Sequence, residues 1–289
     1  MRDLSNPIEK LKIKMHELTD TQKKVADFII KNPMDVAFYT VDQLAGIVGT
    51  STTTIMRLTF SLGYSGYSEF QKGLQEILRS KAAPHTRLEA NMKDLTKNDL
   101  WLQYVDFQIN SIQNTFDVIT NESLEKTIKT ILNARNIYCT GVRSGLPVAQ
   151  YLTHGLNRLL GNTKLQNADQ SDWIDDVAGF DSTDVVIAIS YPRYARRIVD
   201  LVSHAKKAEA TVIAITDSYS SPLVKYADVI LPCSSSSLSF HNSITSSIFL
   251  ADYLITAVAA QNHEKIKSRL DKVNDILTEI NYHHLPSNQ

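Results

Sequence analysis

The chain has 289 residues, of which 43% are hydrophobic and 21% charged, and its formal net charge is −1. This length allows two domains of ordinary size, and this composition is normal for a soluble globular protein. The longest apolar run, residues 248–260, is interrupted by Asp252 and is too short to span a bilayer, and the polar start of the chain is unlike a signal peptide. We therefore expect a bacterial cytoplasmic protein and no membrane protein.

The two cysteines, Cys139 and Cys233, lie far apart in the sequence, each at the end of an apolar run. This placement favours two buried free thiols over a disulfide or a metal site. We accordingly expect no metal and no cofactor.

Residues 1–80 are predicted to form an all-α domain. Apolar residues recur at helical spacing over residues 11–30, where Thr19 or Asp20 can cap a helix that ends at Asn32, before a proline. The helices expected outside the central part of this domain cover residues 22–31, 36–39 and 68–80.

The central part, residues 41–63, has the pattern of a helix-turn-helix. Two short helices are separated by a turn at Gly49, and Ser51 can cap the second helix. Along that second helix the apolar residues recur at helical spacing, which predicts that they bury against the first helix: Ile55, Leu58 and Leu62 against Leu44 and Ile47. Hydroxyl groups and Arg57 are left to contact DNA in the major groove.

The charge of this domain counts mildly against DNA binding. Residues 1–80 hold ten Lys and Arg and nine Asp and Glu, whereas strong nucleic-acid binders are usually clearly basic. The only charged residue from Thr50 to Ser68 is Arg57. An ordinary helical hairpin with a polar outer face is the competing interpretation of the motif taken alone.

A linker is predicted over residues 81–93, followed by an α/β domain over residues 94–289 that opens with helices at 94–119 and 123–133. Short apolar, β-branched runs then alternate with helical stretches, which indicates a five-stranded parallel sheet covered on both faces, a three-layer flavodoxin-like fold. The predicted strands cover residues 136–140, 163–166, 184–190, 211–216 and 228–232. The predicted helices cover residues 146–160, 194–207, 222–226 and 243–260.

Ligands of such sheets bind at the carboxyl ends of the strands. The first strand runs into Gly141, Arg143, Ser144 and Gly145, and a glycine turn before a helix favours an anion. A plain strand-to-helix turn explains these residues equally well.

The third strand ends at Ser190, and Arg193, Arg196 and Arg197 follow at the predicted start of a helix. Cations there oppose the helix dipole, a conflict that an anionic ligand removes. We expect Arg193 to bind the ligand and Arg197 to lie in solvent or pair with Asp200. Ser243 or Asn242 can cap the last predicted helix, and His241 is a further candidate, although a lone loop histidine is more often structural.

The chain resembles the RpiR-type bacterial regulators. The resemblance rests on residues 18–33, on Gln43, Leu44 and Ala45, on Arg57, and on the run Leu62-Gly-Tyr-Ser-Gly-Tyr-Ser-Glu-Phe70. In that family a helix-turn-helix domain precedes a sugar isomerase (SIS) domain, and sugar phosphates control DNA binding. One departure is that Phe60 and Ser61 stand where family members often carry basic residues.

The resemblance implies double-stranded operator DNA and a small anionic metabolite, most simply a sugar phosphate, as partners of a homodimer or homotetramer. The implied DNA-contacting residues are Ser51, Thr52, Thr53, Thr54, Arg57, Tyr64 and Tyr67. The implied ligand-binding residues are Gly141, Arg143, Ser144, Gly145, Ser190, Arg193, His241 and Ser243. SIS domains usually have a Ser/Thr-rich phosphate loop after the third strand; Ser190 matches its start, but residues 191–194 replace its small residues.

The alternative function is a sugar-phosphate isomerase with a helical accessory domain. An aldose–ketose isomerase needs a base, usually a carboxylate or histidine. From Gly141 to Asn262 the only glutamate is Glu209, which precedes the fourth predicted strand. Asp217 is the only well-placed acid, so the sequence favours binding without turnover.

Overall fold

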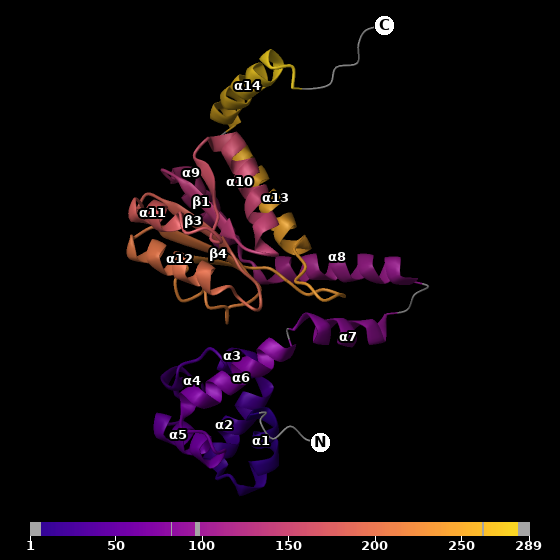
Figure 1. The fold of residues 1–289 in the computed structure, drawn as a ribbon, viewed down its shortest axis with the longest axis vertical. Coiled ribbons are helices and arrows are strands. Elements are labelled where there is room, and N and C mark those ends of the chain that lie inside the picture. The colour runs from indigo at the N-terminus through magenta and orange to yellow at the C-terminus, as the bar shows by residue number, and fades with distance from the viewer. Residues whose placement is uncertain (1–6, 82, 96–98, 262, 283–289) are drawn as a thin grey trace. The chain divides into compact units, whose positions relative to one another are not determined.

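The computed structural model describes residues 7–81, 83–95, 99–261 and 263–282. They divide into two compact units, Met1–Asp94 and Leu95–Gln289. Figure 1 shows that the first unit is built of helices and that the second contains the sheet.

Side-chain caps fix where the helices of the first unit begin. The side chains of Thr19 and Thr40 each accept a hydrogen bond from the backbone N–H three residues on, and the side chains of Gln22 and Gln43 accept one from the backbone N–H of the cap residue, so both form capping boxes. The helices are α1 (Pro7–Lys14), α2 (Asp20–Lys31), α3 (Pro33–Val36), α4 (Val41–Val48), α5 (Thr52–Ser61), α6 (Tyr67–Lys81) and α7 (Pro84–Asp94), with a 3₁₀ turn at Met15–Glu17.

The core of this unit gathers one apolar face from each of its longer helices. Leu11, Ile29, Leu44, Leu58 and Phe70 are fully buried in it. The predicted burial of Ile55, Leu58 and Leu62 is confirmed, but that of Ile47 is wrong. Its side chain is 51% exposed, because Leu44 and Ala45 already fill the face that α4 turns to the core.

The second unit contains the predicted five-stranded parallel sheet, and its strand order is β2-β1-β3-β4-β5. The register places Gly141 beside Ile189 and Ile189 beside Ile215. The strands are β1 (Ile137–Gly141), β2 (Thr163–Gln166), β3 (Val185–Ile189), β4 (Thr211–Thr216) and β5 (Val229–Pro232). The helices are α8 (Leu100–Val118), α9 (Asn121–Asn133), α10 (Gly145–Leu160), α11 (Trp173–Ala178), α12 (Arg196–Lys207), α13 (Thr245–Gln261) and α14 (His263–Glu279).

Alternate residues of each strand face two different cores. Ile137, Cys139 and Ile187 pack with α9, α10 and α13 on one face of the sheet. Tyr138 and Val186 pack with α11 and α12 on the other (Figure 1). Both cysteines are buried and free, as predicted, and burial raises the pKa of each thiol to about 12.

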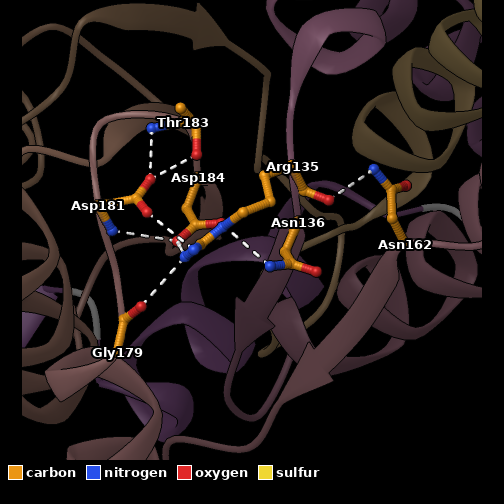
Figure 2. Close-up of polar contacts among 7 residues, drawn as sticks. All are labelled: Arg135, Asn136, Asn162, Gly179, Asp181, Thr183 and Asp184. Atoms are coloured by element: carbon orange, nitrogen blue, oxygen red, sulfur yellow. Dashed lines mark hydrogen bonds and ion pairs between the residues drawn. The ribbon is translucent and has the colours of Figure 1, made fainter.

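A polar cluster joins the amino ends of β1 and β3 (Figure 2). The buried carboxylate of Asp184 accepts hydrogen bonds from Arg135 Nε (3.0 Å), from Arg135 Nη2, from Asn136 Nδ2 (3.2 Å) and from the Asp181 backbone N–H (3.1 Å). Arg135 also pairs with Asp181 at 2.8 Å and donates to the Gly179 carbonyl. These bonds satisfy a carboxylate that would otherwise be costly to bury.

Several segments differ from the sequence prediction. The predicted linker contains α7, and residue 82 lies outside the described residues. Residues 222–226 form turns instead of a helix, closed by bonds such as Val224 N–H to the Ser221 carbonyl. Helices α11 and α14 were not predicted. Within the described residues, no helix is long and apolar enough to cross a membrane.

Candidate functional site

The helix-turn-helix is built by α4 and α5. Helix α4 ends at Gly49, whose φ of +70° allows the left-handed turn that leads into α5. Ser51 caps α5, since its Oγ accepts a hydrogen bond from the Thr54 backbone N–H at 3.2 Å. The Ser51 and Thr54 hydroxyls also lie 3.0 Å apart. Both hydroxyls therefore stabilise the start of α5.

One face of α5 is left outside the core. Thr53, Arg57 and Phe60 are exposed and, with spacings of four and three residues, share this face. Thr52 and Thr54 are half-buried beside it. This face combines the cation of Arg57, the exposed Thr53 and the ring of Phe60, which is 53% exposed.

Two residues of the predicted DNA-contacting set lie in the core instead. Tyr64 and Tyr67 are only 9% and 6% exposed. The Tyr67 hydroxyl donates to the backbone carbonyls of Val36 and Tyr39, and the Tyr64 ring packs edge-on against Phe70. Burial and these partners give both side chains a structural role, which argues against the predicted DNA contact.

Lys14 is a basic residue near α5 that the sequence analysis missed. Its Nζ donates to the Ser61 backbone carbonyl at 2.6 Å and so brings a cation to the end of the helix. Ser61 is one of the two positions where a basic residue was expected and absent. Lys14 is 47 residues away in sequence, and no local pattern signals the contact.

In the second unit, the residues predicted to bind an anion follow two neighbouring strands. The loop after β1 leads into α10 and the loop after β3 leads into α12, and these helices cover opposite faces of the sheet. A Cβ on Gly141 would come within 2.6 Å of the Gly145 backbone, and one on Gly145 within 2.7 Å of the Ile189 carbonyl oxygen. Both glycines are therefore required by the close approach of the β1 loop to β3.

Each of these loops carries an exposed arginine in a left-handed backbone conformation. Arg143 has a φ of +52° and Arg193 a φ of +72°. Neither helix start has a side-chain cap: Ser144 before α10 and Ala195 before α12 make no capping bond. Uncapped backbone N–H groups and guanidinium groups are thus gathered at one edge of the sheet, an arrangement that suits an anion.

The neighbouring arginines have partners of their own. Arg197 forms an ion pair with Asp169, and Arg196 lies 3.6 Å from Asp200. Arg197 thus pairs with a different aspartate from the one expected.

The loop after β3 is held by two of its tyrosines, the buried Tyr191 and the half-buried Tyr194, and by the segment before α13. The Tyr191 hydroxyl bonds to Ser247 Oγ at 2.6 Å, and Asn242 Nδ2 donates to the Pro192 carbonyl at 3.1 Å. Tyr194 donates to Asp217 Oδ1 at 2.7 Å. Burial raises the pKa of Asp217, despite this bond.

Ser243 and His241 differ in their surroundings. Ser243 is buried, and its Oγ accepts a hydrogen bond from the backbone N–H of Thr245, the first residue of α13. His241 is exposed and packs edge-on against Phe240.

Two buried hydroxyl groups, each close in sequence to a predicted ligand-binding residue, lack a hydrogen-bond partner among the described residues. Within the described part of the chain, neither Thr140 Oγ1, just before Gly141, nor Ser246 Oγ, in the first turn of α13, has a hydrogen-bond partner. Buried polar groups without partners are uncommon in folded proteins. Ser190, also buried, follows β3, and its backbone N–H donates to the Ile215 carbonyl of β4.

Comparison with known families assigns both units. Residues 5–81 match the rpiR-family helix-turn-helix domain, and residues 130–257 match the SIS domain. The chain therefore joins an rpiR-family helix-turn-helix domain to an SIS domain.

Relatives with the same two domains span nearly the whole chain. An uncharacterised helix-turn-helix-type transcriptional regulator of Thermotoga maritima is 23% identical over 284 residues, 95% of this chain and 99% of the relative. The transcriptional regulator HexR of Pseudomonas aeruginosa is 24% identical over 286 residues, 96% and 98% of the two chains.

Among solved structures, the Vibrio vulnificus NanR protein complexed with ManNAc-6P has the same fold. It superposes with a TM-score of 0.66 and 22% identity, over 95% of this chain and 99% of that one. The predicted all-α domain followed by an SIS-type α/β domain is thus confirmed.

Proposed function

We propose that this protein is a bacterial transcriptional regulator that binds operator DNA through α5 and responds to an anionic metabolite bound by its SIS domain. One observation carries the proposal. A single chain holds a helix-turn-helix with an exposed hydroxyl-and-arginine face, together with an SIS sheet whose carboxyl edge carries two outward arginines. Relatives with both domains are named transcriptional regulators.

In the proposed DNA complex, α5 lies in the major groove. Arg57 and Thr53 face the bases or phosphates, Ser51 and the N–H groups at the start of α5 bind phosphate, and Thr52 and Thr54 lie beside them. Lys14 supplies a phosphate contact where Phe60 and Ser61 supply none. A face with so few charges binds weakly by itself, so a homodimer or homotetramer on a palindromic operator fits it best.

In the proposed effector complex, the anion lies at the carboxyl ends of β1 and β3. Arg143 and Arg193 pair with it, while Gly141, Ser144 and Gly145 form the tight turn beside it. Ser190 and Ser243 line the same edge, and His241 is the outermost candidate. The solved NanR relative was complexed with ManNAc-6P, and a sugar phosphate is accordingly the first ligand class to test.

Arg57→Ala tests the DNA half of the proposal. Loss of one phosphate or base contact should weaken operator binding about 5- to 100-fold, and loss of a phosphate contact also lowers the salt slope by about one. Footprinting upstream of neighbouring genes would supply the operator, and fluorescence anisotropy at several salt concentrations would give both quantities. Lys207→Ala, which removes one exposed charge from α12, is the control. An unchanged affinity and slope in Arg57→Ala would place this residue away from DNA.

A sugar-phosphate isomerase is the alternative. It needs a base at the carboxyl edge of the sheet, where Asp217 is bound by Tyr194 and Thr216, and His241 is the other candidate. Glu209 lies at the amino end of β4, far along the strand from this edge. We therefore propose binding without turnover. An isomerase activity that Asp217→Asn or His241→Ala abolished would overturn this part of the proposal.

A further inference from the structure

Phe60 is a large apolar side chain on the otherwise polar outer face of α5. Its ring is 53% exposed and shares this face with Arg57 and Thr53. Among the described residues, Phe60 belongs neither to the buried core of the first unit nor to the apolar side chains packed against that core. An amphipathic helix normally turns its large apolar residues inward, so packing within the unit does not explain this ring.

The end of α5 that carries Phe60 is held in place by its neighbours. Leu58, on the inner side of the helix, is fully buried. The Phe60 carbonyl accepts a hydrogen bond from the Gly63 backbone N–H at 2.9 Å, and Lys14 Nζ donates to the Ser61 carbonyl at 2.6 Å. The ring therefore projects from a fixed backbone position, which lowers the entropy cost of any contact that it makes with a partner.

The chemistry of the ring limits what it can contact in the DNA complex proposed above. A phenyl group has no charge and no hydrogen-bond donor, so it makes neither of the usual contacts to a phosphate. The flat faces of the bases are stacked inside an intact duplex, out of reach of the ring. The apolar group that the major groove does present is the 5-methyl group of thymine.

We propose that Phe60 is a specificity-determining residue for operator DNA, and that its ring covers the 5-methyl group of a thymine in the major groove. This inference rests on the proposed function, in which α5 lies in that groove. Residues 57 and 60 are separated by about 4.5 Å along the helix axis, and successive base pairs by roughly 3.4 Å. The thymine should therefore lie within about two base pairs of the position that Arg57 contacts.

A methyl contact and a phosphate contact differ in how they depend on salt and on sequence. A phosphate contact releases counterions and adds to the salt slope of binding, whereas a ring over a methyl group releases none. Phe60 should therefore affect the choice of base and leave the salt slope unchanged. Lys14, proposed above as a phosphate contact, should do the reverse.

Replacing single thymines of the footprinted operator by deoxyuridine tests the proposal, because this change removes the methyl group and keeps every hydrogen-bonding group of the base. Fluorescence anisotropy would give the affinity of the wild type and of Phe60→Ala for each substituted duplex. We expect the wild type to lose affinity about three- to fivefold at one thymine, the effect of exposing one buried methyl group. Phe60→Ala should bind the unmodified operator more weakly by at least that factor. It should no longer distinguish thymine from uracil at that position, and its salt slope should equal that of the wild type.

Two further variants separate the methyl contact from other losses of affinity. Phe60→Leu keeps an apolar side chain and should retain part of the preference for thymine. Ile47→Ala removes a side chain of similar exposure, 51%, from α4 and should retain the whole preference. A Phe60→Ala variant with the wild-type preference at every thymine would overturn the proposal, because the ring would then act on all sequences alike.

The same measurements keep this inference apart from the proposed function. A wild type without sequence-specific binding to DNA would overturn both. Specific binding that depends on Arg57 but is indifferent to every thymine methyl group would overturn the role of Phe60 alone and leave the proposed regulator intact.

Discussion

Left-handed backbone at residues other than glycine is concentrated at a few positions of the second unit. Arg143 and Arg193 are in the loops at the carboxyl edge of the sheet, while Glu209 has a φ of +65° in the turn between α12 and β4. Glu209 has a structural explanation: its backbone N–H and that of Ala210 bond back to the last turn of α12. No such closing bond accounts for Arg193 among the described contacts. A strained backbone of this kind, which costs roughly 1 to 3 kcal/mol, is often found where a loop binds a ligand.

Arg193→Gly should separate the effect of backbone strain on stability from the effect of the guanidinium on effector binding. Glycine adopts a positive φ without steric cost, so the free energy of unfolding should be unchanged or rise by up to about 1 kcal/mol. Affinity for the effector should fall at least tenfold, because the guanidinium is lost. Isothermal titration with a panel of sugar phosphates, beginning with ManNAc-6P, and denaturant unfolding would measure the two effects.

Glu209→Gly is the control, because it relieves the same backbone conformation in the turn before β4. It should raise or maintain stability and leave the affinity unchanged. If Arg193→Gly behaved in the same way as Glu209→Gly in both measurements, Arg193 would have no part in binding the effector.

Among the structural elements, β1 and β3 depend most on the buried carboxylate of Asp184. It receives four hydrogen bonds from three residues, and its main cationic partner, Arg135, is itself 47% exposed. Burial alone would raise the pKa of Asp184, but the bonds from Arg135, Asp181 and Asn136 outweigh burial and lower it. The charged form is therefore the form that stabilises the fold.

Asp184→Asn should destabilise the second unit by about 2–4 kcal/mol, because Arg135 loses the buried one of its two anionic partners and keeps only the half-exposed Asp181. The pKa of the wild-type group is lower in the folded than in the unfolded state. Its contribution is thus complete above the unfolded pKa of about 3.9 and is lost as the pH falls through the folded pKa. Denaturant unfolding at pH 7 and at pH 3 checks this, since the difference between wild type and variant should shrink at the lower pH. An equal difference at both values would mean that charge is not the cause.

The central strands β1, β3 and β4 could be predicted from the sequence because each is a short, mainly apolar run with β-branched residues, and their burial on both faces leaves little freedom. The same pattern predicts that Gly141 and Ser190 lie at the carboxyl edge of the sheet, because each lies where one of these strands ends. The helix predicted over residues 222–226 is wrong, since five residues with one proline fit a turn or a helix equally well. Burial of Tyr64 and Tyr67, and the contact of Lys14 with Ser61, depend on residues distant in sequence and leave no periodic signal.

At the scale of the whole molecule, hydrogen bonds connect the proposed effector loop to α8. The Pro192 carbonyl accepts from Asn242, the Ser243 backbone N–H donates to the Ser235 carbonyl, and the Ser234 N–H donates to Thr115. Each step lies next to the previous one along the chain. If the effector shifts the loop after β3, α8 is the element that receives the change, and coupling between sites acts equally in both directions.

Thr115→Val should weaken this coupling while leaving both binding sites in place, because it removes the acceptor of the Ser234 N–H. We expect effector affinity in the absence of DNA to change less than threefold. The change in operator affinity caused by saturating effector should fall at least threefold. Thr278→Val on α14, which removes a similar helical hydroxyl bond, is the control. Anisotropy titrations with and without effector measure both, and full coupling in Thr115→Val would show that the path runs elsewhere.

The cluster around Asp184 sits at the amino ends of the strands, whereas the arginine loops follow their carboxyl ends. The residues that stabilise the sheet and the residues proposed to bind the effector thus lie at opposite ends of the same strands. A library confined to Arg143, Ser144 and Arg193, none of which is buried, could therefore be screened for new effectors without eroding the scaffold. Gly141 and Gly145 should stay fixed, because their neighbours leave no room for a side chain. The chain is in this sense a practical starting point for biosensors with altered metabolite specificity.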